Sequence, residues 1–171
     1  MTETEFKAKV LSLAPKVFPL ARRMLGTSEL AHDAVQQSMM KLWENRKDLS
    51  KLANCKAFVF KVVRNVCLDE LKKKKPVYVQ EFLPQSGEVV HADLIHDCQE
   101  MVAIVQQVIA SLSDAQREVI QLRDIDGLEF DEISEITATD VAYVRVLLSR
   151  ARKTVKDKLE KIYSYEAIRN E

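Results

Sequence analysis

Apolar residues recur at three- and four-residue steps along most of this chain, which is the pattern of helices that bury one face. The clearest case follows Asp140, where the spaced apolar positions are Val141, Val144, Leu148, Ala151, Val155 and Leu159. The other side of this predicted helix carries Tyr143, Arg145, Ser149, Arg150, Arg152, Lys153 and Lys156. A shorter helix with Ile133 and Ile136 precedes it, and residues 137–140 supply a turn and an N-cap. Two helices joined by a tight turn, of which the second has a basic outer side, are typical of a helix-turn-helix. The second helix of such a motif enters the DNA major groove.

The same periodicity predicts further helices before this motif. Thr2 and Glu5 predict a capping box for a first helix, which Pro15 and Pro19 bend or interrupt. Later helices are expected from Glu29 to about Arg46, from Ala57 to Lys74, from about Asp97, and after a capping box at 113–116. Their expected core faces are Leu30, Ala31, Ala34, Val35, Ser38, Met39 and Leu42; Phe60, Val63, Val66, Cys67 and Leu71; and Met101, Val102, Val105, Val108 and Ile109.

The fold class follows from what the sequence uses and what it lacks. The chain has 171 residues with three glycines and four prolines, and no long alternation of apolar and polar residues predicts strands. Residues 76–96 contain Pro84 and Gly87 and have no regular period, so we interpret them as a flexible linker. We therefore expect an all-α protein with two small helical domains, residues 1–75 and 97–171, the second containing the helix-turn-helix.

The formal net charge of zero conceals a strong segregation of charge along the sequence. The net charge is +8 over residues 1–75, −5 over 76–111, −7 over 112–140 and +4 over 141–171. The linker is thus acidic, and two basic blocks are available to meet a polyanion at two places.

The cysteines and the N-terminus bear on the compartment. Cys55, Cys67 and Cys98 are an odd number without metal-ligand spacing, which indicates buried thiols in a reducing cytosol. The N-terminal residues lack the order of charges and apolar residues that marks a signal peptide, and no apolar run approaches the length of a membrane span. The sequence predicts a cytoplasmic protein.

Three ordered motifs resemble the extracytoplasmic-function (ECF) class of bacterial sigma factors, over nearly the whole chain. ELAHDAVQQSMMKLW at 29–43 is similar to that family's DAEDLVQETFLRLW, and NCKAFVFKVVRNVCLDELKKK at 54–74 resembles N-P-x-A-W-L-x-x-I-A-R-N-x-x-x-D-x-x-R-R. LSDAQREVIQLRDIDGLEFDEISEI, followed by LSRARK, is similar to L-P-x-x-x-R-E-V-F-x-L-R-x-x-x-G-x-S-Y-x-E-I-A-E-I and L-x-R-A-R-K. The resemblance implies a dissociable subunit that directs RNA polymerase to a small set of promoters and helps to melt them.

The resemblance also assigns residues to three surfaces. It places Asp33, Gln36, Gln37, Met40 and Trp43 on the helix that docks on the β′ clamp helices of core RNA polymerase, which also contacts such proteins through its β subunit. It places Asn54, Lys56, Phe58, Lys61, Arg64, Asn65 and Asp69 where the melted −10 strand of promoter DNA is held. It places Tyr143, Arg145, Ser149, Arg150, Arg152 and Lys153 on the helix that reads the −35 element. An anti-sigma factor, often membrane-bound in this family, is a further expected partner; no cofactor, metal or small-molecule substrate is expected.

The sequence departs from the family pattern at four positions. Ala138 stands where glycine is common in the turn, Glu129 replaces a serine N-cap, and Cys55 replaces a proline. Leu147 stands where arginine is common, so we expect one DNA contact to be missing there.

Three other functions make different demands on the same residues. The pairs His32-Asp33 and His96-Asp97 are similar to those of metal-dependent phosphohydrolases, but the third histidine, His91, lies in the predicted linker, so too few ligands converge. A repressor would use only the helix-turn-helix and would bind duplex DNA unaided. A helical adaptor without a DNA role would tolerate replacement of Arg145 and Arg150.

Overall fold

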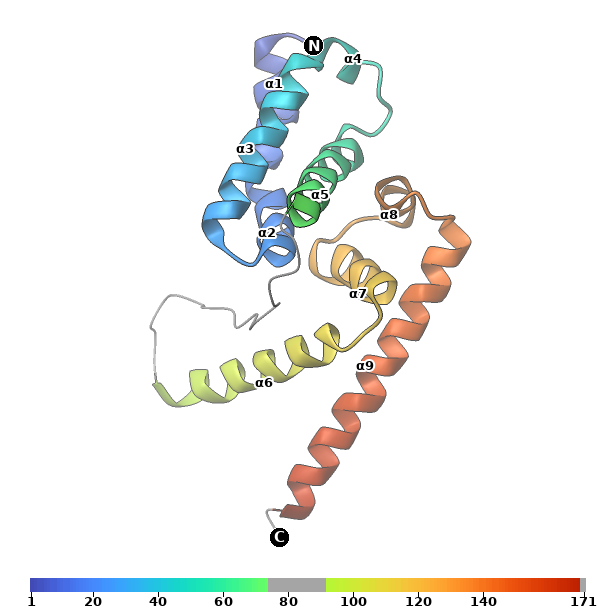
Figure 1. Ribbon diagram of the computed structural model, residues 1–171. Coiled ribbons are helices and arrows are strands. Elements are labelled where there is room, and N and C mark those ends of the chain that lie inside the picture. Colours follow the sequence, from blue (N-terminus) through green and yellow to red (C-terminus); the bar gives the residue numbers. More distant parts are fainter. Residues whose placement is uncertain (74–91, 170–171) are drawn as a thin grey trace.

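The computed structural model describes residues 1–73 and 92–169, with side chains over 1–73 and 101–164. Within these ranges the chain is helical and contains no strand, so the predicted all-α class is confirmed. The elements, shown in Figure 1, are α1 (Glu3–Lys9), a 3₁₀ turn (Leu11–Leu13), α2 (Ala14–Leu25), α3 (Ser28–Glu44), α4 (Arg46–Leu49), α5 (Cys55–Lys73), α6 (Ala92–Ala110), α7 (Asp114–Ile120), a π turn (Gln121–Ile125), α8 (Phe130–Thr137) and α9 (Val141–Arg169).

The first predicted helix is divided into two helices. The capping box is present, because the Thr2 side chain and the Glu5 carboxylate each accept a backbone N–H of the other residue. The division falls at residues 10–13, before the prolines. Pro15 lies in the first turn of α2, where its missing N–H costs nothing, and Pro19 lies within that helix. Pro15 therefore starts a helix where it was expected to bend or interrupt one.

The middle of the chain follows the predicted pattern with two corrections. Thr27 caps α3 by accepting the backbone N–H of Leu30. The connection expected at 44–56 contains α4, whose Leu49 is buried. Leu71, expected in the core, is 43% exposed, because the whole last turn of α5 lies outside the packed region.

The second half differs from the prediction mainly at its start. Helix α6 begins at Ala92, earlier than the expected start near Asp97, whereas the linker residues 76–91 lie outside the described part of the chain. Among the described side chains of α6, which begin at Met101, Val108 is buried, but Met101 and Val102 are each 53% exposed. Ser113 is the N-cap of α7, yet its side chain makes no capping hydrogen bond, so the capping box predicted there is wrong.

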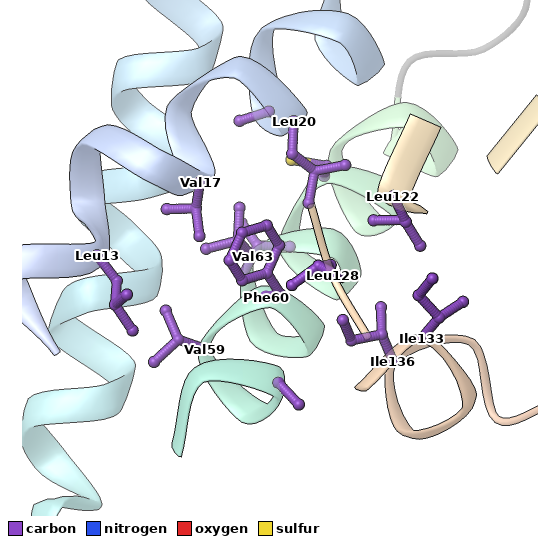
Figure 2. Packing of buried hydrophobic residues seen from close by; sticks show 14 of the residues in the cluster. Leu13, Val17, Leu20, Val59, Phe60, Val63, Leu122, Leu128, Ile133 and Ile136 are labelled. Atoms are coloured by element: carbon purple, nitrogen blue, oxygen red, sulfur yellow. The ribbon is translucent and has the colours of Figure 1, made fainter. Parts of the chain in front are cut away.

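The two groups of helices pack on each other through one continuous apolar core. Helix α5 packs against α2 and α3 on one side and against α8 on the other, and α9 packs against α7 and α8. Figure 2 shows Phe60 and Val63 of α5 in a cluster with Leu128 and Ile136 from the second group. This packing brings the surfaces predicted for DNA and polymerase onto one body. Among the described residues, no helix combines the length and apolarity needed to cross a membrane.

Candidate DNA- and polymerase-binding surfaces

The turn between α8 and α9 fixes the direction of the predicted recognition helix. Ala138 ends α8 in the left-handed conformation, with φ 53° and ψ 40°. Asp140 then begins α9, because its Oδ1 accepts the backbone N–H of Ala142 at 2.6 Å. The predicted N-cap is confirmed, and the residue that replaces the family's glycine adopts the backbone conformation that favours glycine.

Helix α9 is apolar on one side and polar on the other over its first turns. Val144, Leu147, Leu148 and Ala151 are buried on the inner side. The outer side exposes the residues predicted to read DNA: Tyr143, Arg145, Ser149, Arg150 and Lys153. The Arg145 guanidinium lies over the Phe130 ring, 5.2 Å from its centroid, and Arg123 lies 4.9 Å from the same ring. The contact with Phe130 holds the Arg145 side chain beside the first turns of α9, and the rest of this side chain is exposed to solvent.

Two residues of α9 have a contact or a burial that the sequence did not indicate. Arg152 forms a two-point ion pair with Asp124 in the π turn, with Arg152 Nε to Asp124 Oδ2 at 3.0 Å, while 56% of its side chain stays exposed. Hydrogen bonding to Asp124 raises the Arg152 pKa. Leu147 is only 6% exposed and belongs to the core, and the DNA contact expected to be missing at this position stays a prediction.

Helix α5 presents its predicted strand-binding residues in three environments. Asn65 and Asp69 are exposed, and Lys61 is half-buried. Phe58 is partly buried and packs against the core. Asn54 caps the helix, because its Oδ1 accepts the backbone N–H of Ala57 at 3.0 Å. Asn54 therefore has a structural role whether or not it contacts DNA.

The other two α5 cations predicted to hold the strand, Lys56 and Arg64, contact glutamates of the second group of helices. Arg64 forms a two-point ion pair with Glu118 of α7, in which Nη2 donates to Oε2 at 3.0 Å. Lys56 Nζ donates to Oε2 of Glu132 in α8 at 3.0 Å, and Asn54 Nδ2 lies 3.5 Å from Oε1 of the same carboxylate. Neither glutamate was predicted from the sequence, although both belong to the segment 112–140, whose net charge of −7 was the available signal.

Glu132 is a buried carboxylate with a defined set of partners. Its burial works to raise its pKa, but the backbone N–H of Glu129 and the Lys56 ammonium outweigh this effect and hold the pKa below its usual value. Asp126, which pairs with Arg23 of α2, shows the opposite balance, because its deeper burial raises its pKa despite the arginine. Glu132 is thus stabilised as an anion at the contact between α8 and α5.

The predicted polymerase-docking residues lie together on α3. Asp33, Gln36, Gln37 and Met40 are exposed, and Trp43 is 36% exposed. The Trp43 ring meets Phe6 edge-on at 5.0 Å and carries the Arg46 guanidinium at 4.2 Å. An open groove of ≈ 510 Å³ lies beside these rings, lined by Glu3, Phe6, Lys7, Leu11, Gln36, Met39, Met40, Trp43 and Glu44. A groove that is apolar within and polar at its rim suits a protein helix.

The histidine-aspartate pairs do not assemble in the described part of the chain. The His32 ring packs on Phe18 with centroids 4.4 Å apart, and Asp33 is exposed. No group of three or more metal-ligating side chains is found among the described residues, and the side chains of His91 and His96 lie outside them.

Comparisons with known proteins match both halves of the chain. The sigma-70 region 2 family matches residues 10–77, and the sigma-70 region 4 family matches residues 103–155. The ECF RNA polymerase sigma factor SigW of Bacillus subtilis is 27% identical over 155 residues, covering 84% of this chain and 83% of SigW.

Solved structures with the same fold include the sigma factor RpoE of Bartonella quintana in complex with the anti-sigma factor NepR. It has a TM-score of 0.72 and 22% identity, covering 91% of this chain and 97% of that one. CnrH in complex with the cytosolic domain of CnrY has a TM-score of 0.65 and 18% identity, covering 94% and 90%. The chain belongs to the sigma-70 family, as an alternative sigma factor of the ECF class for RNA polymerase.

Proposed function

We propose that this chain brings core RNA polymerase to promoters by reading two DNA elements and that it helps to open the second of them. In this proposal α9 reads the −35 element, α5 holds one strand of the melted −10 element, and α3 docks on the β′ clamp helices. The residues 1–75 and 97–171 act as the two DNA-reading domains, and the chain itself performs no chemistry.

The outer side of α9 suits duplex recognition. Arg145 is the candidate for a direct base contact, because a guanidinium can donate two hydrogen bonds to guanine in the major groove. Arg150 and Lys153 lie further along the same exposed side and are candidates for phosphate contacts, together with Ser149 and Tyr143. Arg152, which is paired with Asp124, is the weakest candidate of the set.

Helix α5 offers the chemistry that a separated strand needs. Melting requires a surface that prefers single strands, through stacking groups, polar side chains for unpaired bases and cations along the backbone. Asn65 and Asp69 are open to bases, Lys61 and Arg64 are cations on the same helix, and Phe58 supplies a partly covered ring.

The α3 surface and its groove are proposed to bind polymerase. Amide, carboxylate and methionine side chains around Trp43 form an adaptable polar and apolar surface. The β subunit is a further expected contact. An anti-sigma factor is proposed as a partner because the RpoE structure of similar fold contains one. A location in the cytoplasm follows from this function.

The observation that carries the proposal is the presence of separate polar surfaces on α3, α5 and α9, of which those on α3 and α9 are exposed and that on α5 is partly covered. A repressor needs only the third of these. The net charge of zero also fits a protein that binds promoters weakly unless polymerase carries it there.

Run-off transcription with purified core polymerase on a pool of genomic promoter fragments tests the proposal. We expect transcripts only when the chain and core are both present. Arg145→Ala should reduce the amount of transcript, because it removes a base contact worth about 1–3 kcal/mol. Lys161→Ala, which removes an exposed cation further along α9, is the matched control and should leave it unchanged. Binding of duplex DNA without any polymerase-dependent transcript would instead establish a repressor, and no effect of Arg145→Ala or Arg150→Ala in either assay would indicate an adaptor.

A further inference from the structure

The second half of this chain covers part of α5, the helix proposed to hold the −10 strand. Arg64 and Lys56, two cations of the proposed −10 surface, are paired with Glu118 and Glu132, which belong to helices on the far side of the linker. The Arg64 and Glu118 side chains are 19% and 29% exposed, and those of Lys56 and Glu132 are 35% and 11% exposed, so both pairs are partly buried. Such pairs are shielded from water, so they are stronger than pairs on the open surface.

The carboxylates occupy positions that suit the anionic oxygens of DNA. A guanidinium binds a carboxylate and a phosphate in the same two-point manner, and the Arg64–Glu118 pair has this geometry. Asn54 and Lys56 both contact one carboxylate, that of Glu132. Three predicted strand contacts are therefore satisfied by acidic groups of the same chain.

Apolar packing holds this arrangement in place. Leu128, Ile133 and Ile136 are buried in the same cluster as Phe60 and Val63, as Figure 2 shows. The Arg23–Asp126 ion pair adds a link between α2 and the loop before α8. Separation of the two halves would expose apolar surface and uncover these charges, so the closed arrangement is a stable state of the free chain.

We propose that this closed arrangement is autoinhibitory, with Glu118 and Glu132 as an internal substitute for DNA that keeps Arg64 and Lys56 occupied until polymerase separates the two halves. The proposal rests on the proposed role of α5 in holding the −10 strand. It adds that the free chain binds single-stranded DNA poorly because its own glutamates compete for the same cations.

The test compares single-strand binding by the full-length chain without polymerase. Fluorescence anisotropy with a short, labelled, mixed-sequence single-stranded DNA measures the dissociation constant of the wild type and of the Glu118→Gln/Glu132→Gln variant. Glutamine keeps the shape of both side chains, and at position 132 it still accepts the N–H of Glu129 in the capping box. The matched control is Asp131→Asn/Glu135→Gln, which makes the same change of charge at exposed positions of α8.

We expect the Glu118→Gln/Glu132→Gln variant to bind roughly tenfold more tightly than wild type, the factor that corresponds to ~1.4 kcal/mol. The control variant should bind within about twofold of wild type. It changes the net charge by the same amount as Glu118→Gln/Glu132→Gln, but it alters only the nonspecific attraction of DNA. Equal affinities of the wild type and the Glu118→Gln/Glu132→Gln variant, or an equal gain in the control, overturn the proposal.

A second measurement does not depend on the double variant. Lysine acylation followed by mass spectrometry compares Lys56 with Lys61, which is half-buried on the same helix. Lys56 should react more slowly than Lys61 in the wild type and should gain reactivity selectively in Glu132→Gln. Equal reactivity of Lys56 in both proteins overturns the internal contact.

Failure of this inference is distinguishable from failure of the proposed function. If wild type supports polymerase-dependent run-off but Glu118→Gln/Glu132→Gln gains no affinity for single strands, the sigma role stands and autoinhibition is refuted. If neither protein supports run-off, the proposed function fails first, and the autoinhibition that rests on it fails as well.

Discussion

Replacement of Ala138 by glycine should stabilise this protein. Ala138 ends α8 with φ 53° and ψ 40°, a left-handed conformation in which a Cβ costs about 1–2 kcal/mol. Glycine removes that cost but gains freedom in the unfolded chain, which costs roughly 0.5–1 kcal/mol. The net effect is a gain of about 0.5–1 kcal/mol in the free energy of unfolding, or a rise in Tm of roughly 1–4 °C for a chain of this size.

Urea unfolding followed by far-UV circular dichroism measures this change through the midpoint, with the slope expected to stay constant. Ala142→Gly is the control, because Ala142 is an exposed residue in the first turn of α9. There glycine should destabilise the protein by up to about 1 kcal/mol. Run-off transcription should be unaltered by Ala138→Gly, since the turn keeps its geometry. A lower unfolding midpoint for Ala138→Gly than for wild type would refute this account of the turn.

Three further predictions follow from burial and charge. Burial raises the pKa of the Cys67 thiol to about 11, so near neutral pH its alkylation by iodoacetamide should be far slower than that of the partly exposed Cys55, and comparable rates would contradict its burial. The pKa of Glu132 is lower in the folded chain than unfolded, so its stabilising contribution is complete above the unfolded value near 4.5 and is lost as the pH falls through the folded value. Glu132→Gln should therefore lower the free energy of unfolding at neutral pH, with the difference from wild type shrinking in acid; a difference independent of pH would disprove this linkage. Leu122→Ala should cost about 2–5 kcal/mol in urea unfolding because Leu122 is fully buried, whereas Leu71→Ala should change little, and similar losses would contradict the packing described.

The helices were predictable from the sequence because their signals are local. The capping box at Thr2, the cap at Asp140 and the apolar spacing of α3, α5 and α9 all act within a few residues. Leu71 and Met101 were misplaced because periodicity shows that a helix has an apolar side but cannot show where the neighbouring helices stop covering it.

The contacts between the two halves were not predictable in the same way. Arg64 and Glu118 are 54 residues apart, and no repeat or spacing links them. Leu147 shows the limit of resemblance, because its alignment with a family arginine gave no sign that it is buried with Val144 and Leu148 on the inner side of α9. Asn54 was predicted as a strand contact, which stays a prediction, whereas its helix-capping role is visible only in the structure.

The most direct test of the sigma role is permanganate footprinting of unpaired thymines on DNA from a responsive promoter. We predict reactivity in the −10 region that requires both this chain and core polymerase and that weakens with Asn65→Ala, an exposed α5 residue outside the contacts with Glu118 and Glu132. Protection of duplex DNA by the chain alone, with no reactive thymine when core polymerase is added, would contradict it.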